Sequence, residues 1–297
     1  MISIIITSYK EPKTIAKAIE SVLYGLSENY EIIQISPDKE TLEAGFKKAE
    51  ELKILKNFKQ LQDPCQGKPH ALNLALNETK GDILILTDGD VFFDKNATTE
   101  LIKPFQKNNV YGVTGRPVSR DKKDTMMGYF GHLLSDAAHH KRMKTLKKRK
   151  FFPMSGYIMA MRNFQLKLPE DVLSDDAYIS YVITNKGKQI SYTPKAKAFV
   201  KYPRNLNDYY KQKVRSLGGY LQLQEYDVVN KGKKTRTFKD EIAYFWFPFS
   251  YASSFREFFW SMLLFPIRLI TWIRIFFDRK ILKKDFVKSW TRIESTK

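Results

Sequence analysis

The sequence predicts an α/β protein built on a mostly parallel β-sheet with crossover helices, and two observations support this prediction. Short apolar segments alternate with helical patterns in the N-terminal third, which is the order expected when helices connect parallel strands. The chain has 297 residues, of which 43% are hydrophobic and 14% aromatic, enough to fill a large core. This composition excludes disordered, collagen-like and small disulfide-bonded proteins.

The predicted elements follow in order from the N-terminus. Strands are expected at residues 3–7, 31–36 and 83–87, where apolar side chains run together. A helix is expected at 15–23, because apolar residues recur there every three or four positions, and further helices are expected at 42–52 and 69–77, between and beside the strands. Further along we expect a helix at 97–106, a strand at 110–114, an ordered apolar run at 154–161, a helix at 177–185, and edge strands at 189–193 and 198–202.

Polar loops follow the predicted strands at residues 7–11, 36–38 and 88–90. Ligands of parallel sheets bind beyond the carboxyl ends of the strands, so these loops mark the predicted site. Asp88 and Asp90 offer the oxygen ligands that a divalent cation prefers, and Gly89 between them allows close backbone approach. Such triplets are also common in turns, so this one does not establish a metal site by itself.

Five segments occur in a fixed order: SIIITSYKEP, GKPHALNLAL, GDILILTDGDVFFD, LSDDAYIS and KQKVR. Together they resemble inverting family 2 glycosyltransferases, which have the GT-A fold, over roughly residues 1–220. The resemblance implies a catalytic domain at 1–225, with a nucleotide-sugar-binding half at 1–115 and an acceptor-side half at 116–225. It also implies sugar transfer from a nucleotide-diphosphate donor, with a UDP-sugar as first candidate, to a hydroxyl of a glycan or lipid-linked acceptor.

The resemblance assigns the nucleobase to the first two predicted loops. Thr7, Tyr9 and Glu11 would lie against the base, and Asp38 would accept a hydrogen bond from its ring N–H. Family members often carry two adjacent acids at the end of the second strand. This chain has Asp38 alone there, at a shifted spacing, which leaves the identity of the base open.

The phosphates would be held by charged groups of both signs. The resemblance implies that Asp90 ligates Mg²⁺ or Mn²⁺, that Asp88 touches the ribose or the outer shell of the metal, and that Lys68 lies near the phosphates. Fixed cations suit this position, because the leaving nucleoside diphosphate gains negative charge as the sugar bond breaks. An ordinary solvated lysine is the alternative for Lys68.

An inverting transfer needs a base on the face opposite the leaving group. Asp175 and Asp176 match the acidic pair of the family, and the resemblance assigns deprotonation of the acceptor hydroxyl to Asp176, with Asp175 beside it on the acceptor side. Both residues also suit the first turn of a helix, where the helix dipole stabilises acids. The two interpretations are compatible.

Near the end of the matched region, Gln212 and Arg215 resemble a Q-x-x-R-W signature, with Gln212 on the acceptor side and Arg215 neutralising the diphosphate. Ser216 stands where the signature has tryptophan, so processive synthesis is not supported. Gly218 and Gly219 are expected to form a tight turn, and a surface arginine is the alternative for Arg215.

The charge balance favours anionic partners. The chain has 51 basic and 32 acidic residues, a formal net charge of +19. The run at 141–150 is strongly basic and is interpreted as a patch for an anionic lipid or acceptor, or as a solvated loop. No nucleic-acid-binding motif accompanies it, so no nucleic-acid partner is expected. The lone Cys65 cannot form an internal disulfide, which fits the cytoplasm.

The C-terminal region 226–297 is predicted to associate with membrane through an amphipathic segment at 242–277. Its apolar face is wide, Trp260 and Trp272 lie near the border, and Pro266 is expected to bend or split the helix. We therefore expect a helix lying in the interface at the cytoplasmic face of the cell membrane. Packing of the apolar face on the catalytic domain and a strained transmembrane passage remain alternatives.

Two other function classes remain open from the sequence. A sugar-1-phosphate nucleotidyltransferase would share the strand order and the metal carboxylates, but its glycine-rich first loop is absent from TSYKEP. A non-enzymatic basic protein that binds membrane surfaces or nucleic acid would use the same acids only structurally.

Overall fold

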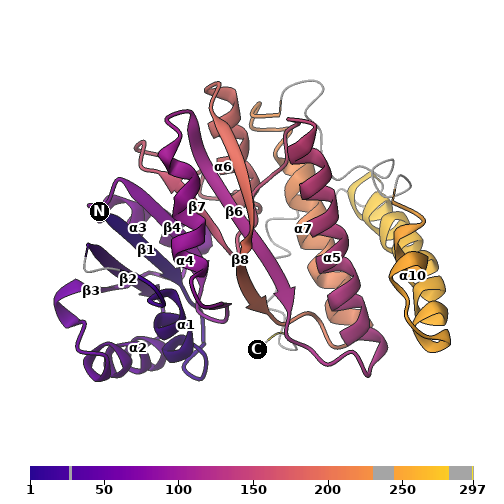
Figure 1. The fold of residues 1–297 in the computed structure, drawn as a ribbon, viewed down its shortest axis with the longest axis horizontal. Coiled ribbons are helices and arrows are strands. Elements are labelled where there is room, and N and C mark those ends of the chain that lie inside the picture. The colour runs from indigo at the N-terminus through magenta and orange to yellow at the C-terminus, as the bar shows by residue number, and fades with distance from the viewer. Residues whose placement is uncertain (27–28, 230–243, 281–295, 297) are drawn as a thin grey trace. The chain divides into compact units, whose positions relative to one another are not determined.

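The computed structural model describes residues 1–26, 29–229, 244–280 and 296, and these form two compact units (Figure 1). The first unit comprises residues 1–118, 145–171 and 175–200 and contains the β-sheet. The second comprises the described parts of 119–144, 172–174 and 201–297 and is helical. The domain limits expected at residues 115 and 225 stay predictions.

The N-terminal half of the sheet is parallel. It contains β1 (Ile2–Thr7), β2 (Tyr30–Ser36), β3 (Phe58–Gln62) and β4 (Ile83–Asp88), in the spatial order β3-β2-β1-β4 (Figure 1). The chain builds outward from β1 to β3 and then returns to place β4 on the other side of β1. The gap between the carboxyl ends of β1 and β4 is therefore the switch point, where sheets of this kind bind ligands.

The second half of the sheet adds antiparallel pairs. β7 (Met159–Arg162) pairs with β4 and with β6 (Val110–Ser119), and β5 (Phe92–Phe93) pairs with β8 (Gln189–Val200). The expectation of two edge strands at 189–193 and 198–202 is wrong. A single strand, β8, runs through Pro194 and lies between β6 and β5, because alternate residues on both sides of the proline share one buried face: Tyr192, Ala196, Ala198 and Val200.

The predicted crossover helices are present in the first unit. They are α1 (Ile15–Val22), α2 (Lys39–Glu51), α3 (Lys68–Asn77), α4 (Ala97–Ile102) and α6 (Asp175–Asn185), with 3₁₀ turns at Leu55–Asn57 and Lys103–Gln106. The three-or-four spacing in α1 places its apolar residues in the core, as Ile15, Ala18, Ile19 and Val22 are fully buried. The α/β prediction with crossover helices is confirmed.

The second unit contains α5 (Met126–Lys147) up to Lys144, together with α7 (Leu206–Gln222), α9 (Phe247–Tyr251) and α10 (Phe255–Lys280). Its core combines Tyr129, Phe130 and Leu133 of α5 with Tyr209 of α7 and Leu264 of α10. Residues 141–147 of the basic run are helical, as part of α5, so their interpretation as a loop is wrong.

Two glycines predicted to form a turn are helical instead. Gly218 and Gly219 lie inside α7 and are buried. A Cβ on Gly219 would lie 2.3 Å from Oγ of Ser174, so this glycine serves the close approach of α7 to the segment before α6. The hydrogen bond from the backbone N–H of Leu173 to the side chain of Gln222 ties the same segment to α7.

The C-terminal apolar segment is helical, as expected, but it breaks at a different place. α10 continues through Pro266, so a split there is wrong, whereas a bend at Pro266 stays a prediction, and the break falls between Tyr251 and Phe255. By length and composition α10 could cross a membrane over Phe255–Asp278, although the core helix of a soluble protein can pass the same test. Residues 230–243, 281–295 and 297 of the predicted C-terminal region lie outside the described residues.

Gly45 provides a test of how α2 packs on β2. A Cβ at Gly45 would lie 1.9 Å from Oε1 of Gln34, a fully buried side chain that donates to the carbonyl of Thr41 and accepts from Gln60. Gly45→Ala should therefore lower the free energy of unfolding by about 1–3 kcal/mol through overpacking. At a solvent-exposed position inside a helix, the same change would stabilise the protein. Denaturant unfolding measures the change, with Lys47→Ala on the exposed face of α2 as control. A gain in stability would contradict this packing.

Candidate active site

The candidate active site begins where β1 and β4 end side by side. Thr7 and Asp88 are paired in the register of the two parallel strands, and Oγ1 of Thr7 donates to Oδ1 of Asp88 at 2.8 Å. The backbone N–H of Gly89 donates to the carbonyl of Thr7 at 2.8 Å, which fixes the turn after β4. These bonds hold the predicted carboxylate at the switch point of the sheet.

Gly89 is required by the packing of this turn. A Cβ at Gly89 would lie 2.5 Å from Oε2 of Glu11 and 2.7 Å from Cβ of Ser8. The carboxylate of Glu11 therefore packs beside the turn that carries Asp88 and Asp90, rather than standing apart on the first loop. Asp90 follows on the same turn and is partly exposed.

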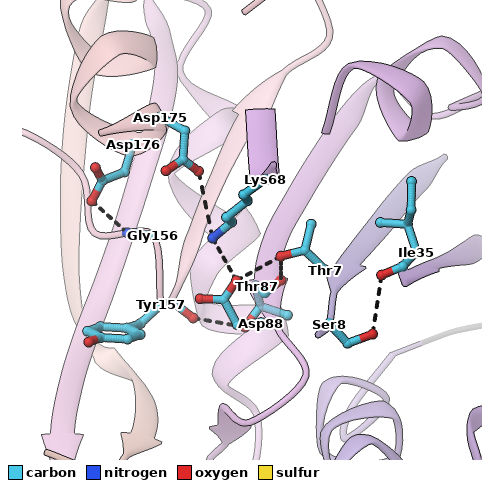
Figure 2. Close-up of polar contacts among 10 residues, drawn as sticks. All are labelled: Thr7, Ser8, Ile35, Lys68, Thr87, Asp88, Gly156, Tyr157, Asp175 and Asp176. Atoms are coloured by element: carbon cyan, nitrogen blue, oxygen red, sulfur yellow. Dashed lines mark hydrogen bonds and ion pairs between the residues drawn. The ribbon is translucent and has the colours of Figure 1, made fainter. Parts of the chain in front are cut away.

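Lys68 connects two carboxylates that are distant in sequence (Figure 2). Its Nζ lies 2.6 Å from Oδ1 of Asp88 and 3.7 Å from Oδ2 of Asp175. Lys68 is the first residue of α3, after Gly67 at φ 104°. The positive end of the helix dipole lies at the N-terminus and repels the ammonium group of Lys68. The two carboxylates must therefore compensate for this repulsion. An ordinary solvated lysine at this position is excluded by these contacts.

The two acids at the start of α6, Asp175 and Asp176, contact different groups. Asp175 faces Lys68, whereas Oδ2 of Asp176 accepts from the backbone N–H of Gly156 at 3.0 Å (Figure 2). Oδ1 of Asp176 also accepts from the backbone N–H of Ala177 at 2.8 Å. Asp176 is therefore oriented by two backbone donors, next to the charged cluster formed by Lys68, Asp88 and Asp175.

The charges in this cluster shift one another's titration. Burial acts to lower the pKa of Lys68, but the carboxylates of Asp175, Asp88 and Asp176 outweigh it, and the pKa lies well above its ordinary value. Burial raises the pKa of Asp175, the negative charges of Asp176 and Asp88 raise it further, and Lys68 acts in the opposite direction. Lys68 thus stays charged at neutral pH, and Asp175 is the acid whose ionisation the site disfavours.

The residues predicted to contact the base lie at the ends of β1 and β2. Asp38 caps α2: its carboxylate accepts from the backbone N–H of Thr41 at 3.0 Å, from that of Lys10 at 2.6 Å and from Oγ of Ser36 at 3.0 Å. Burial acts to raise the pKa of Asp38, but these hydrogen bonds outweigh it and hold the pKa below its ordinary value. The role of Asp38 toward a base stays a prediction, as do those of Tyr9 and Glu11.

Sequence reasoning missed two parts of this edge of the sheet. Asp63 follows β3, is 7% exposed, and its backbone N–H donates to the carbonyl of Ser36 at 3.2 Å. It was missed because β3 has a polar alternating pattern that did not indicate a strand. Gly156, whose N–H holds Asp176, carries no side-chain signal that could have identified it.

Two predicted residues belong to the second unit. Gln212 and Arg215 lie one turn apart on α7, as their spacing requires. Their roles toward acceptor and diphosphate stay predictions.

The carboxylates of this edge have the chemistry that a divalent cation needs, as hard oxygen ligands one residue apart on a fixed turn. Within the described residues, no group of three or more His, Cys, Asp or Glu side chains is arranged to hold a metal. Oδ1 of Asp88 accepts from Thr7 and Lys68, and Asp90 lies two residues later on the same turn; metal ligation by either carboxylate stays a prediction. A cation here would have to complete its shell with ligand oxygens from outside the protein.

Comparison with known proteins identifies the family. The model of the family described as "Glycosyltransferase like family 2" matches residues 1–219. Poly-beta-1,6-N-acetyl-D-glucosamine synthase of Staphylococcus aureus is 26% identical over 228 residues, which cover 74% of this chain and 54% of the relative. The synthase of Staphylococcus epidermidis is 26% identical over 246 residues, 78% of this chain and 58% of the relative. The chain thus spans a little over half the length of these relatives.

Among solved structures, the mannosyltransferase PcManGT from Pyrobaculum calidifontis, in complex with GDP-Man and Mn²⁺, matches with a TM-score of 0.68 and 17% identity. The match covers 95% of this chain and 88% of that protein, so the GT-A fold implied by the sequence is confirmed. The match to the family model decides against the nucleotidyltransferase and non-enzymatic alternatives. This chain is a family 2 glycosyltransferase.

Proposed function

We propose that this enzyme is a metal-dependent inverting glycosyltransferase that moves a sugar from a nucleotide-diphosphate donor to a hydroxyl acceptor. The observation that carries the proposal is the contact of Lys68 with both Asp88 and Asp175, at the switch point of the sheet. This contact brings together the end of β4 and the start of α6, which hold the donor-side and acceptor-side acids of the proposal. A UDP-sugar is the first candidate donor.

The proposal gives the two acids of α6 different tasks. Asp175 contacts Lys68, so it would keep that ammonium group in place where the leaving diphosphate gains charge. Asp176 is oriented by the N–H groups of Gly156 and Ala177, and would take the proton of the acceptor hydroxyl as the general base. The acceptor would be a glycan or a lipid-linked glycan.

Asp90, with Asp88 beside it, would hold Mg²⁺ or Mn²⁺. When bound, such a cation supplies positive charge that stabilises the leaving diphosphate. The Mn²⁺ in the complex of the mannosyltransferase PcManGT supports this part of the proposal. Thr7 and Gly89 would contribute to metal binding by fixing the turn that carries Asp88 and Asp90.

We propose that transfer takes place at the cytoplasmic face of the cell membrane. The support comes from the apolar helix α10, the net charge of +19, and the single cysteine. The proposed membrane region is 226–297, following a catalytic domain at 1–225.

Asp176→Asn tests the proposed base. Transfer should fall by about 10²–10⁴-fold, the range for loss of general base catalysis, while donor affinity changes little. Release of nucleoside diphosphate measures transfer, and calorimetric titration of the donor measures affinity. The exposed Asp124→Asn serves as control and should retain full activity. Wild-type turnover in Asp176→Asn would remove this residue from the mechanism.

Lys68→Met tests the charge cluster through its pH dependence. Without the ammonium group, the pKa of Asp175 should rise further, since Lys68 opposes the effects of burial and of the neighbouring acids. An acid whose pKa is raised in the folded state costs stability once it ionises, and protonation relieves this cost as the pH falls. The deficit in Tm relative to wild type should therefore be largest near pH 8 and shrink toward pH 5.

Lys56→Met, at an exposed lysine, is the control for this series and should show no such pH dependence. A deficit in Lys68→Met that is constant from pH 5 to pH 8 would show that the lysine acts through packing rather than charge.

Asp90→Asn tests the proposed metal ligand. Donor affinity in the presence of Mn²⁺ should weaken at least about tenfold, a loss seen even for groups that only orient metal ligands. Without metal, the variant and the wild type should bind the donor equally weakly. Calorimetry with and without EDTA measures both values. Equal affinities in the presence of Mn²⁺ would exclude Asp90 as a ligand.

A further inference from the structure

The helix α10 presents its polar side to the protein. Its buried residues are spaced three, four or seven positions apart, which places them on one side of the helix, and most of them are polar: Glu257, Ser261, Leu264, Thr271 and Ile275. Ser261 is fully buried, and its hydroxyl lies 2.7 Å from the hydroxyl of Tyr129 on α5. A soluble amphipathic helix buries the opposite, apolar side.

Charged groups of α10 also bond inward within the second unit. Arg268 donates to the hydroxyl of Tyr209 on α7 at 3.2 Å, and the hydroxyl of Tyr210 donates to Asp278 at 3.2 Å. The guanidinium of Arg274 lies 4.4 Å from the ring centre of Tyr210. These contacts along α7 fix which side of α10 faces outward.

The outward side of α10 is apolar. Ile270 and Phe277 are 56% and 51% exposed, and the same face includes Phe259, Met262, Ile273 and Phe276. Next to α10, Trp246 at the start of α9 is 76% exposed. Soluble proteins rarely expose a continuous apolar surface of this kind unless it has a partner. Within the described part of the second unit, this apolar face therefore lies outside the packed core, and its packing on the rest of the catalytic domain stays an untested alternative.

Basic side chains accompany the aromatic residues at one end of this surface. The Nζ atoms of Lys141 and Lys144 on α5 each lie 5.9 Å from the ring centre of Tyr244, just before α9. Lys123 lies 4.7 Å from the ring centre of Tyr251. Aromatic rings flanked by lysines beside an apolar face match the headgroup level of a membrane with anionic lipids.

We propose that the outer face of α9 and α10 inserts into one leaflet of an anionic bilayer, with α10 lying in the plane of the interface and Lys123, Lys141 and Lys144 contacting lipid headgroups. α10 does not cross the bilayer, because its polar side is bonded to α5 and α7, and α7 carries the charged Lys211, Lys213 and Arg215.

A second copy of the chain is a less suitable partner, since the basic groups of both copies would repel one another. The inference refines the proposed membrane location and is independent of the donor chemistry.

Vesicle sedimentation of the full chain tests the inference. Wild type should bind phosphatidylcholine vesicles containing phosphatidylglycerol at least ten times more tightly than pure phosphatidylcholine vesicles. The triple variant Ile270→Glu, Ile273→Glu, Phe277→Glu should lose binding to both. The double variant Lys141→Gln, Lys144→Gln should lose mainly the preference for the anionic vesicles.

The matched control is Phe46→Glu, an exposed aromatic residue of α2 in the first unit, which should bind vesicles as wild type does. The three glutamates replace exposed side chains, so Tm should stay near the wild-type value, which excludes unfolding as the cause of lost binding. Donor affinity, measured without lipid, should be the same in all variants.

Unchanged vesicle binding of the triple variant would overturn the proposal. The proposal would also be overturned if the wild type did not bind vesicles but formed a dimer in sedimentation velocity, and if the triple variant abolished that dimer. A second copy of the chain would then cover this face. Vesicle binding without any donor affinity would contradict the proposed enzyme chemistry and leave this inference intact.

Discussion

The arrangement of the site depends on one cation held between carboxylates that come from different parts of the chain. Lys68 at the start of α3 contacts Asp88 at the end of β4 and Asp175 at the start of α6. Without a positive charge at this point, Asp88, Asp175 and Asp176 would repel one another at close range in a partly buried site. The Lys68 contacts therefore allow the two ends of the site to approach, and Thr7 and Gly156 orient the acids on either side.

The sequence predicted the parts of the fold whose patterns are local. β1 and β4 are continuous apolar runs, and α1 has the three-or-four spacing of a helix with one buried face, so each could be recognised alone. β3 was missed because an edge strand with exposed polar residues lacks that signal, and β8 was divided in two because Pro194 interrupts its pattern. The types of the site residues were also predicted, since carboxylates after buried strands are visible in the sequence.

Their contacts were not predictable in the same way. Nothing in the local sequence of Lys68 indicates that Asp175 is its partner, because the contact depends on how α3 and α6 approach across the sheet. The polarity of α10 shows the same limit. Its sequence predicts an apolar face and a polar face, but the hydrogen bonds between Ser261 and Tyr129 and between Arg268 and Tyr209 determine that the polar face is inside the second unit.

The charge of the site contrasts with the charge of the whole chain. Asp88, Asp175 and Asp176 are acids clustered around the ammonium group of Lys68, in a protein with a net charge of +19. A diphosphate alone would meet net repulsion from this set of acids, and a divalent cation would remove much of it. The basic residues of the chain act over longer distances than the site does, and a positive net charge attracts anionic groups even where the charge of the site itself is negative. The basic surface and the acidic site therefore act at different ranges: the surface acts on distant anionic groups, and the acids around Lys68 act on groups that reach the switch point.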